Sequence, residues 1–348
     1  MMRSSWSAGP ADIGIREVDD PVLVNPDDVI VDVRYAAICG SDLWPYRGLL
    51  PRHEPGSTGH EFLGVVSEVG ETVSGFQVGD AVIAPFMYSD GICPECRRGL
   101  QSQCARGGLW GRDGVGAQTE RIRVPFADTT LVALPWADAE IDDALAMRLL
   151  PLADVFATGY HGAVLAGVGP GDVVVVVGDG AVGLSAAIAA GMLGAGRVVL
   201  MGGNPQRLRV AAARGIETLR VFPTDVGAER LAEAFGDLIV DRVIEAVGMQ
   251  AAFDTALDVV RVGGSVGFVG VPHGVDAIAP MRLFSKAVHL AGGTAPARHY
   301  LERFVAETRA GRLDVSVLID RMLPFDAIKD GYEAMDTGES LKVVLRIR

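Results

Sequence analysis

Hydrophobic runs that alternate with helical stretches mark the middle of the chain. The run Val173–Val177 is entirely valine, as is typical of a parallel strand buried on both faces, and an alanine-rich helix and a second apolar strand follow it. Strands that alternate with helices predict a doubly wound parallel sheet of the α/β class over residues 153–293. The strands expected there are 171–177, 197–201, 217–222, 241–248, 264–270 and 287–293, with helices at 228–235 and 250–260.

Shorter strands, separated by glycine turns, mark the first part of the chain. Strand character is clear at 28–38 and 61–70, and a turn followed by a strand is expected at 73–85. This pattern predicts an irregular β-rich domain over residues 1–152. Residues 294–348 return to mixed strand and helix, and we expect them to pack back on that first domain.

Composition and charge narrow the class of protein. The chain has 348 residues and a net charge of −13, and no basic block offsets the acidic excess, which argues against a nucleic-acid partner. No apolar run reaches the roughly 18–20 residues that cross a bilayer, and the first residues lack the apolar segment of a secretory signal. Four cysteines are too few for a disulfide scaffold and favour metal binding. We therefore expect a cytoplasmic protein with neither a membrane nor a nucleic acid as partner.

A glycine motif follows the valine run directly. Gly178, Gly180 and Gly183 form G-x-G-x-x-G between a strand and a helix. The first glycine permits the turn, the second lets a pyrophosphate approach the backbone, and the third lets helix and strand pack closely. Ala181 and Val182 begin the helix, whose N–H groups would face the anion. A plain strand-to-helix turn is the alternative, but the complete strand–helix–strand context predicts a dinucleotide site.

The next strand ends without the acidic residue that binds the ribose of NAD. Gly202, Gly203 and Asn204 stand at that place, and Arg207 lies one helical turn beyond. A missing carboxylate removes the repulsion of a 2′-phosphate, and an arginine attracts it. Both cofactors remain open, with NADP(H) favoured over NAD(H), and Gly202→Asp should shift the preference towards NAD.

Three residues far apart in sequence carry metal-binding groups. Cys39, His60 and Asp154 offer thiolate, imidazole and carboxylate, the mixture zinc uses when one coordination position stays open. Each also has an ordinary interpretation, as a buried thiol, a core histidine and a helix N-cap. Their distance in sequence alone does not join them.

Four motifs together resemble a known family. "CGSD" at Cys39, "GHE" at Gly59, "DVFATGY" at Asp154 and "VVGDGAVG" at Val176 occur in the order and spacing of the zinc-containing medium-chain alcohol dehydrogenases, and the likeness runs nearly end to end. The resemblance implies a GroES-like catalytic domain split by a Rossmann domain. It also implies hydride transfer between NAD(P) and an alcohol or carbonyl substrate, in a homodimer or homotetramer.

The same resemblance assigns roles at the first metal site. Cys39, His60 and Asp154 would bind catalytic zinc, Glu61 would be an outer or alternating fourth ligand, and Asp42 would orient the imidazole.

The residues after Cys39 would handle the proton. Ser41 would take it from the alcohol. Trp44 replaces a histidine that relays the proton in many members, and an indole cannot shuttle a proton near neutral pH. We expect Trp44 to line the substrate pocket and the relay to end at the cofactor ribose, water or another group such as His53.

A second cysteine group resembles the structural zinc lobe of the family. Three cysteines fill the last three ligand positions, and an aspartate stands in the first; the set is Asp90, Cys93, Cys96 and Cys104. We expect bound zinc here, with an unmetallated loop of reduced thiols as the alternative.

Further cofactor contacts follow from the resemblance. Lys342 would bind the pyrophosphate, Thr158 would meet the nicotinamide face, and Val269 and Val271 would mark the backbone that holds the carboxamide. The leading hypothesis is a zinc-dependent, NAD(P)-linked alcohol dehydrogenase. A zinc-independent quinone- or enone-type reductase and an inactive nucleotide-binding protein remain as alternatives.

Overall fold

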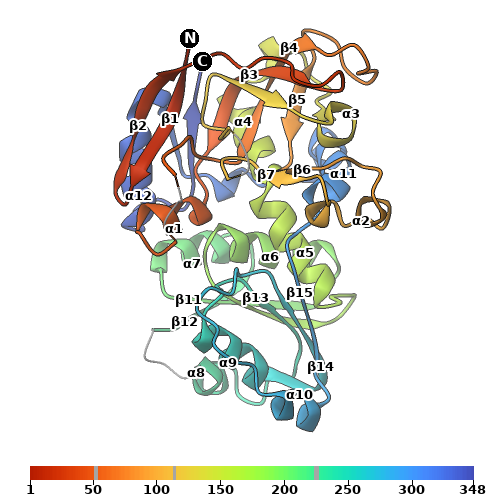
Figure 1. Cartoon of the computed structure of the whole chain (residues 1–348). Coiled ribbons are helices and arrows are strands. Elements are labelled where there is room, and N and C mark those ends of the chain that lie inside the picture. Colours follow the sequence, from red (N-terminus) through yellow and green to blue (C-terminus); the bar gives the residue numbers. More distant parts are fainter. Residues whose placement is uncertain (51–53, 113–114, 223–226) are drawn as a thin grey trace. The chain divides into compact units, whose positions relative to one another are not determined.

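A computed structural model describes residues 1–50, 54–112, 115–222 and 227–348. The chain forms two compact units, one built from Met1–Asp154 with Pro296–Arg348 and the other from Val155–Ala295 (Figure 1). We call them unit 1 and unit 2. Among the described residues, no helix is long and apolar enough to cross a membrane.

Unit 2 contains a six-stranded parallel sheet in the order β12-β11-β10-β13-β14-β15. Its strands are β10 Val173–Val177, β11 Arg197–Gly202, β12 Glu217–Arg220, β13 Val240–Glu245, β14 Val260–Phe268 and β15 His289–Gly292. Its helices are α5 Val155–Leu165, α6 Ala181–Met192, α7 Pro205–Ala212, α8 Gly227–Phe235, α9 Gln250–Val259 and α10 Pro280–Lys286. The predicted doubly wound sheet is confirmed.

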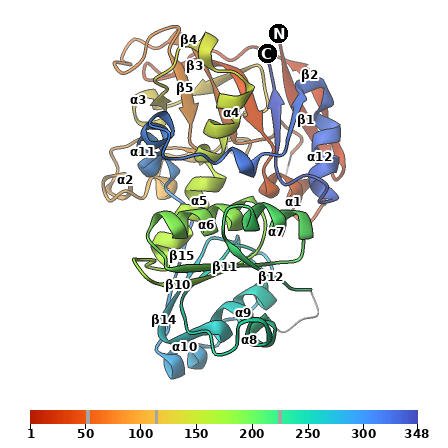
Figure 2. The same ribbon diagram turned by 180° about the vertical axis from the view of Figure 1, so that it is seen from behind.

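Helices cover both faces of this sheet, which explains its apolar strands. Helices α5, α6 and α7 lie on one face and α8, α9 and α10 on the other (Figures 1 and 2). Three residues of the central strand β10, Val174, Val175 and Val176, have no exposed surface. β-Branched side chains suit a strand packed from both sides, because their restricted rotamers fit the pleated surface.

Unit 1 is built around a seven-stranded, mostly antiparallel sheet. The path runs β16-β17-β3-β4-β5-β9, with β8 pairing with β3, and two separate two-stranded antiparallel sheets, β1-β2 and β6-β7, lie outside it. The strands are β1 Met2–Gly9, β2 Asp12–Val18, β3 Val29–Ala37, β4 Glu61–Val69, β5 Ala81–Ala84, β6 Met87–Tyr88, β7 Gly108–Leu109, β8 Arg121–Val124, β9 Val132–Ala133, β16 Arg321–Pro324 and β17 Val343–Arg346. The helices are α1 Leu43–Tyr46, α2 Pro94–Arg97, α3 Ala127–Thr130, α4 Asp143–Leu149, α11 Ala297–Arg309 and α12 Ile328–Asp336.

The last strand of the chain completes the sheet of unit 1. β17 pairs antiparallel with β3, with Val344 opposite Ala37, and the N–H of Ile38 donates to the carbonyl of Val343 at 3.0 Å. This pairing brings residues near the C-terminus beside the end of β3. It therefore places Lys342 next to the segment that carries Cys39.

Candidate metal centre and nucleotide loop

Cys39 lies just after the end of β3, where a short 3-10 turn, Gly40–Asp42, begins. Its backbone N–H donates to Oδ2 of Asp42 at 2.9 Å, so the aspartate closes the turn. The thiol side chain is buried, with 7% of the residue exposed. The turn therefore fixes the orientation of the thiol without help from a metal.

His60 lies just before β4, after a glycine that no other residue can replace easily. Gly59 has φ +86°, and a Cβ there would lie 2.6 Å from Cγ of Gln118. The ring of His60 has its Nδ1 3.4 Å from Oδ1 of Asp42. The same aspartate therefore faces both the Cys39 turn and the imidazole, and Nε2 points to the opposite side.

Asp154 belongs to the third of three remote segments that meet at this site. It follows the 3-10 turn Leu150–Ala153, whose last carbonyl accepts a hydrogen bond from the backbone N–H of Phe86 at 3.1 Å. Oδ2 of Asp154 lies 3.3 Å from Sγ of Cys39 and 3.1 Å from Nε2 of His60. Sulfur, nitrogen and oxygen thus meet at one point inside unit 1.

Glu61, the first residue of β4, forms a buried ion pair. Its Oε1 lies 2.6 Å from Nζ of Lys342, which also donates to the carbonyl of Ile38 at 3.3 Å. Both side chains are almost fully buried, at 0% and 1% exposure. A buried ammonium needs an anion beside it, and Glu61 is that anion. The expected contact of Lys342 with the cofactor pyrophosphate stays a prediction.

The four donors fit a divalent cation. Ligand atoms of Cys39, His60, Glu61 and Asp154 all lie within 4.8 Å of one another, and every one of these residues is buried. Oε2 of Glu61 is buried and has no hydrogen-bond partner among the described residues. Such an orphaned oxygen is costly unless a cation or donor reaches it. The donor set matches zinc, which takes thiolate, imidazole and carboxylate together.

Burial and the neighbouring charges also shift the pKa values of these groups. Burial, with the carboxylate of Asp154, raises the pKa of the Cys39 thiol. Burial lowers the pKa of His60, but the negative charges of Asp42 and Cys39 outweigh it and raise that pKa well above its usual value. Burial also raises the pKa of Glu61, against the opposing charge of Lys342. A bound cation would reverse the shift of the thiol, since metals bind the thiolate.

The other residues expected near the metal are placed as follows. Ser41 is exposed, and its Oγ lies 3.5 Å from Nε2 of His60. Trp44 is half-buried in α1. His53 lies outside the described residues.

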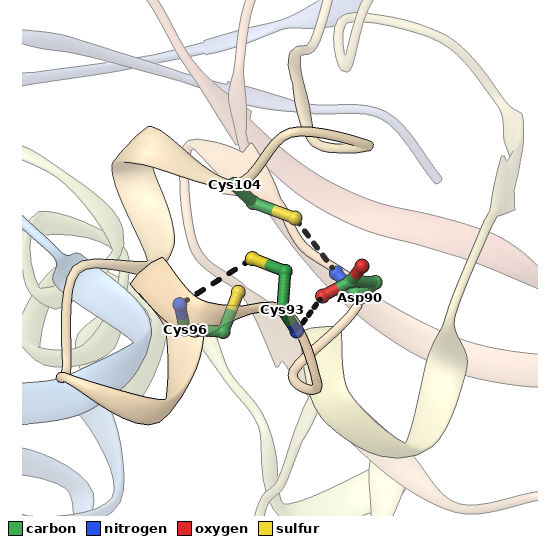
Figure 3. A group of neighbouring side chains, drawn as sticks. All are labelled: Asp90, Cys93, Cys96 and Cys104. Atoms are coloured by element: carbon green, nitrogen blue, oxygen red, sulfur yellow. Dashed lines mark hydrogen bonds between the residues drawn. The ribbon is translucent and has the colours of Figure 1, made fainter.

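The second cysteine group gathers in a loop of unit 1. Asp90, Cys93, Cys96 and Cys104 present ligand atoms within 4.8 Å of one another, and Figure 3 shows the thiols turned toward a common space. Two backbone N–H groups approach sulfur: that of Asp90 at 3.3 Å from Cys104 and that of Cys96 at 3.5 Å from Cys93. The second of these bonds lowers the pKa of Cys93. N–H groups aimed at sulfur favour the thiolate that zinc requires.

The carboxylate of Asp90 is largely occupied by the loop itself. Oδ1 accepts from the N–H groups of Ile92 at 2.9 Å and Cys93 at 3.0 Å, and Oδ2 accepts from Nε of Arg106 at 2.9 Å. An ionised carboxylate offers about four acceptor sites. Three are used, so one remains on Oδ2 for a metal.

The glycine loop of unit 2 follows β10 and leads into α6. Gly178 has φ +114°, a conformation that favours glycine. A Cβ at Gly183 would lie 1.8 Å from the carbonyl oxygen of Gly178, whereas a Cβ at Gly180 would meet nothing within 4 Å. The third glycine therefore allows helix and strand to touch, and the second faces open space. These are the features expected of a strand-to-helix loop that receives a pyrophosphate.

The remaining candidate cofactor residues also lie in unit 2. Thr158 is half-buried in α5; after β14, Val269 is buried and Val271 exposed. Asn204 is the N-cap of α7, and its side chain accepts hydrogen bonds from the backbone N–H groups of Gln206 and Arg207.

The sequence interpretation missed Asp179. Its Oδ2 accepts from the N–H of Asn204 at 2.7 Å. The available signal was an acidic residue between the first two glycines of the motif.

Known proteins resemble the chain throughout its length. Residues 25–135 match the family model of the alcohol dehydrogenase GroES-like domain, and residues 181–309 match that of the zinc-binding dehydrogenases. Zinc-type alcohol dehydrogenase B of Aspergillus flavus is 31% identical over 353 residues, covering 99% of this chain and 81% of that protein. Alcohol dehydrogenase TADH from Thermus sp. ATN1 is 34% identical, with a TM-score of 0.89 and full coverage of both chains. A protein of Sinorhizobium meliloti 1021 described as a zinc-binding dehydrogenase, solved bound to NADP, is 26% identical, with a TM-score of 0.84 and coverage of 100% of this chain and 99% of that one.

Proposed function

The chain belongs to the zinc-containing medium-chain dehydrogenase/reductase family, and we propose that it is a zinc-dependent alcohol dehydrogenase that uses NAD(P). It transfers a hydride between an alcohol and the cofactor, or from the reduced cofactor to an aldehyde or ketone. One observation carries the proposal: four buried donors, Cys39, His60, Glu61 and Asp154, lie within 4.8 Å of one another. Thiolate, imidazole and carboxylate are the ligands of zinc sites that leave a position for substrate.

Each residue near the metal has a distinct task. Cys39, His60 and Asp154 would hold zinc, which supplies Lewis acidity to the substrate oxygen. Asp42 keeps the imidazole oriented from Nδ1, which leaves Nε2 for the metal. Oε2 of Glu61, which is buried without a hydrogen-bond partner among the described residues, would be the fourth donor.

The alcohol proton passes to Ser41 in this proposal. Its exposed hydroxyl lies 3.5 Å from Nε2 of His60, beside the residues that would hold the metal, where it could accept a proton from the substrate hydroxyl. Trp44 cannot pass the proton on, since an indole nitrogen only donates. The proton therefore leaves through water or a ribose hydroxyl of the cofactor, and Trp44 lines the substrate pocket.

Unit 2 binds the cofactor, which supplies the hydride chemistry. The pyrophosphate lies on Gly178, Gly180 and the first turn of α6, at Ala181 and Val182, where open space and free N–H groups coincide. Thr158, Val269 and Val271 are proposed to contact the nicotinamide.

A second zinc ion in the cysteine loop is the companion proposal. The three thiols of Cys93, Cys96 and Cys104 and the remaining lone pair on Oδ2 of Asp90 make four ligands. Metal analysis should then give two zinc ions per chain. One zinc ion per chain, retained at the first site, would leave the loop as an unmetallated turn held by Asp90 and Arg106.

Two alternatives compete with the main proposal. A zinc-independent quinone- or enone-type reductase would have no need of Cys39, His60 and Asp154 at one point. An inactive nucleotide-binding protein is suggested only by Trp44 and Asp90, which replace a proton relay and a cysteine ligand. The complete donor set weighs against both.

Metal analysis and turnover measurements together distinguish these three hypotheses. We expect the purified protein to contain zinc and to reduce NAD(P) with members of an alcohol panel. Cys39→Ala should lose the first zinc ion and turnover while NADH binding persists, because the glycine loop belongs to the other unit. Turnover without zinc would favour the reductase, and zinc without turnover would favour the inactive protein.

A further inference from the structure

The glycine loop of unit 2 places a carboxylate at the end of β11, where the sequence lacks one. Resting on the proposed cofactor-dependent function, we propose that Asp179 takes the place of the acidic residue missing at Gly202 and makes this protein selective for NAD(H) over NADP(H). This reverses the preference expected from Gly202 and Arg207 alone.

Strand pairing brings the two positions together. β10 and β11 are parallel neighbours, with Val177 opposite Met201, and the N–H of Gly178 donates to the carbonyl of Met201 at 2.9 Å. The ends of these two strands therefore lie side by side at the carboxyl edge of the sheet. Gly202 is the last residue of β11, and Asp179 lies two residues after the end of β10.

The side chain of Asp179 fills the space that a side chain at Gly202 would occupy. A Cβ built on Gly202 would lie 2.3 Å from Cβ, 2.4 Å from Cγ and 2.4 Å from Oδ2 of Asp179. Gly202 is thus glycine because another residue's carboxylate already lies there. A carboxylate therefore lies at the end of β11, although the residue at that position of β11 is a glycine.

Two contacts keep the carboxylate in place. Oδ2 accepts the backbone N–H of Asn204 at 2.7 Å, and Oδ1 lies 3.9 Å from Nη1 of Arg207. The side chain of Asp179 is only 14% exposed. An ionised carboxylate offers about four acceptor sites, so in this proposal Oδ1 accepts a hydrogen bond from a ribose 2′-hydroxyl.

This arrangement has opposite consequences for the two cofactors. A 2′-hydroxyl can donate to the carboxylate, whereas a 2′-phosphate would bring two negative charges against it. Arg207, expected to attract that phosphate, has its charge balanced by Asp179. Removing the carboxylate would both end the repulsion and leave the guanidinium facing the phosphate.

Direct binding measurements test the inference apart from catalysis. Dissociation constants for NADH and NADPH are measured by fluorescence titration of the zinc-loaded protein. We expect the wild type to bind NADH at least about tenfold more tightly than NADPH, and Asp179→Asn to reduce that ratio by about tenfold or more, mainly through tighter NADPH binding.

A transplanted carboxylate provides the matched control. The double variant Asp179→Gly with Gly202→Asp removes the obstructing Cβ and moves the acid onto β11, so NADH selectivity should return. Gly202→Asp alone should weaken both cofactors, because its side chain collides with Asp179.

The contradicting outcomes are distinct. A wild-type protein that binds NADPH more tightly than NADH would overturn this inference alone, and that measurement does not depend on whether a variant folds. An Asp179→Asn variant that binds both cofactors equally more weakly would also overturn it. A wild type that binds neither nucleotide would overturn the proposed function and this inference with it.

Discussion

Lys342→Met removes one half of the buried ion pair with Glu61. The charges lie 2.6 Å apart with 1% and 0% of their side chains exposed. At an effective dielectric constant of about 20, their attraction is about 6 kcal/mol. Most of it offsets the cost of burying two charges, but removing one partner leaves the other uncompensated, which costs about 3–5 kcal/mol. We expect the free energy of unfolding of unit 1 to fall by that amount.

Tryptophan fluorescence during urea denaturation measures this change in unit 1 alone. All four tryptophans of the chain, at positions 6, 44, 110 and 136, lie in unit 1. Lys329→Met is the matched control, because Lys329 is exposed on α12 and its replacement should cost no more than about 0.5 kcal/mol.

A double variant tests whether the loss comes from Glu61. Adding Glu61→Gln to Lys342→Met removes the uncompensated charge and should recover about 2 kcal/mol. A loss below about 1 kcal/mol in Lys342→Met, or no recovery in the double variant, would refute the reasoning.

Three further predictions concern other parts of the molecule. Gly183→Ala places a Cβ 1.8 Å from the carbonyl oxygen of Gly178 and should weaken NADH binding at least about tenfold. Gly191→Ala, on the same helix, places a Cβ that meets nothing within 4 Å; it should leave NADH binding unchanged and add up to about 1 kcal/mol of stability. Equal effects of the two variants on NADH binding would contradict this account. Burial raises the pKa of Asp28, but hydrogen bonds from two backbone N–H groups and a guanidinium outweigh burial, so the net effect is a lowered pKa. The contribution of Asp28 to stability is therefore present above the unfolded pKa of about 4 and is lost as the pH falls. Asp28→Ala should cost about 2–3 kcal/mol in urea denaturation at pH 7 and little near pH 2, and a pH-independent cost would be the contrary result. Ser41→Ala should lower kcat by about 10²- to 10⁴-fold with zinc content and NADH affinity unchanged, and wild-type turnover would remove Ser41 from the proton path.

The nucleotide-binding unit could be predicted from the sequence because its signals are local. The valine run of β10, the glycines after it and the helix α6 are contiguous, and short connections between alternating strands and helices predict parallel neighbours. Unit 1 was harder, since its sheet joins β3 to β17 from opposite ends of the chain.

Side-chain partners across long distances could not be predicted. Lys342 lies 281 residues from Glu61, and only the folded sheet shows that its ammonium faces a carboxylate. Asp179 lies in the loop after β10 and Gly202 at the end of β11, so the sequence showed a missing acid where the structure has one supplied from the loop after the neighbouring strand. For Asp90, residue type predicted a ligand, but its hydrogen bonds decide how many lone pairs remain.

The central claim is that Cys39, His60 and Asp154 bind one zinc ion from three remote segments. A crystal structure with anomalous data collected at the zinc edge tests it most directly. The account predicts an anomalous peak about 2.3 Å from Sγ of Cys39 and about 2.0–2.1 Å from Nε2 of His60, with a carboxylate oxygen of Asp154 at a similar distance. A zinc-supplemented crystal with no peak among these three side chains, or with the side chains turned away from one another, would contradict it.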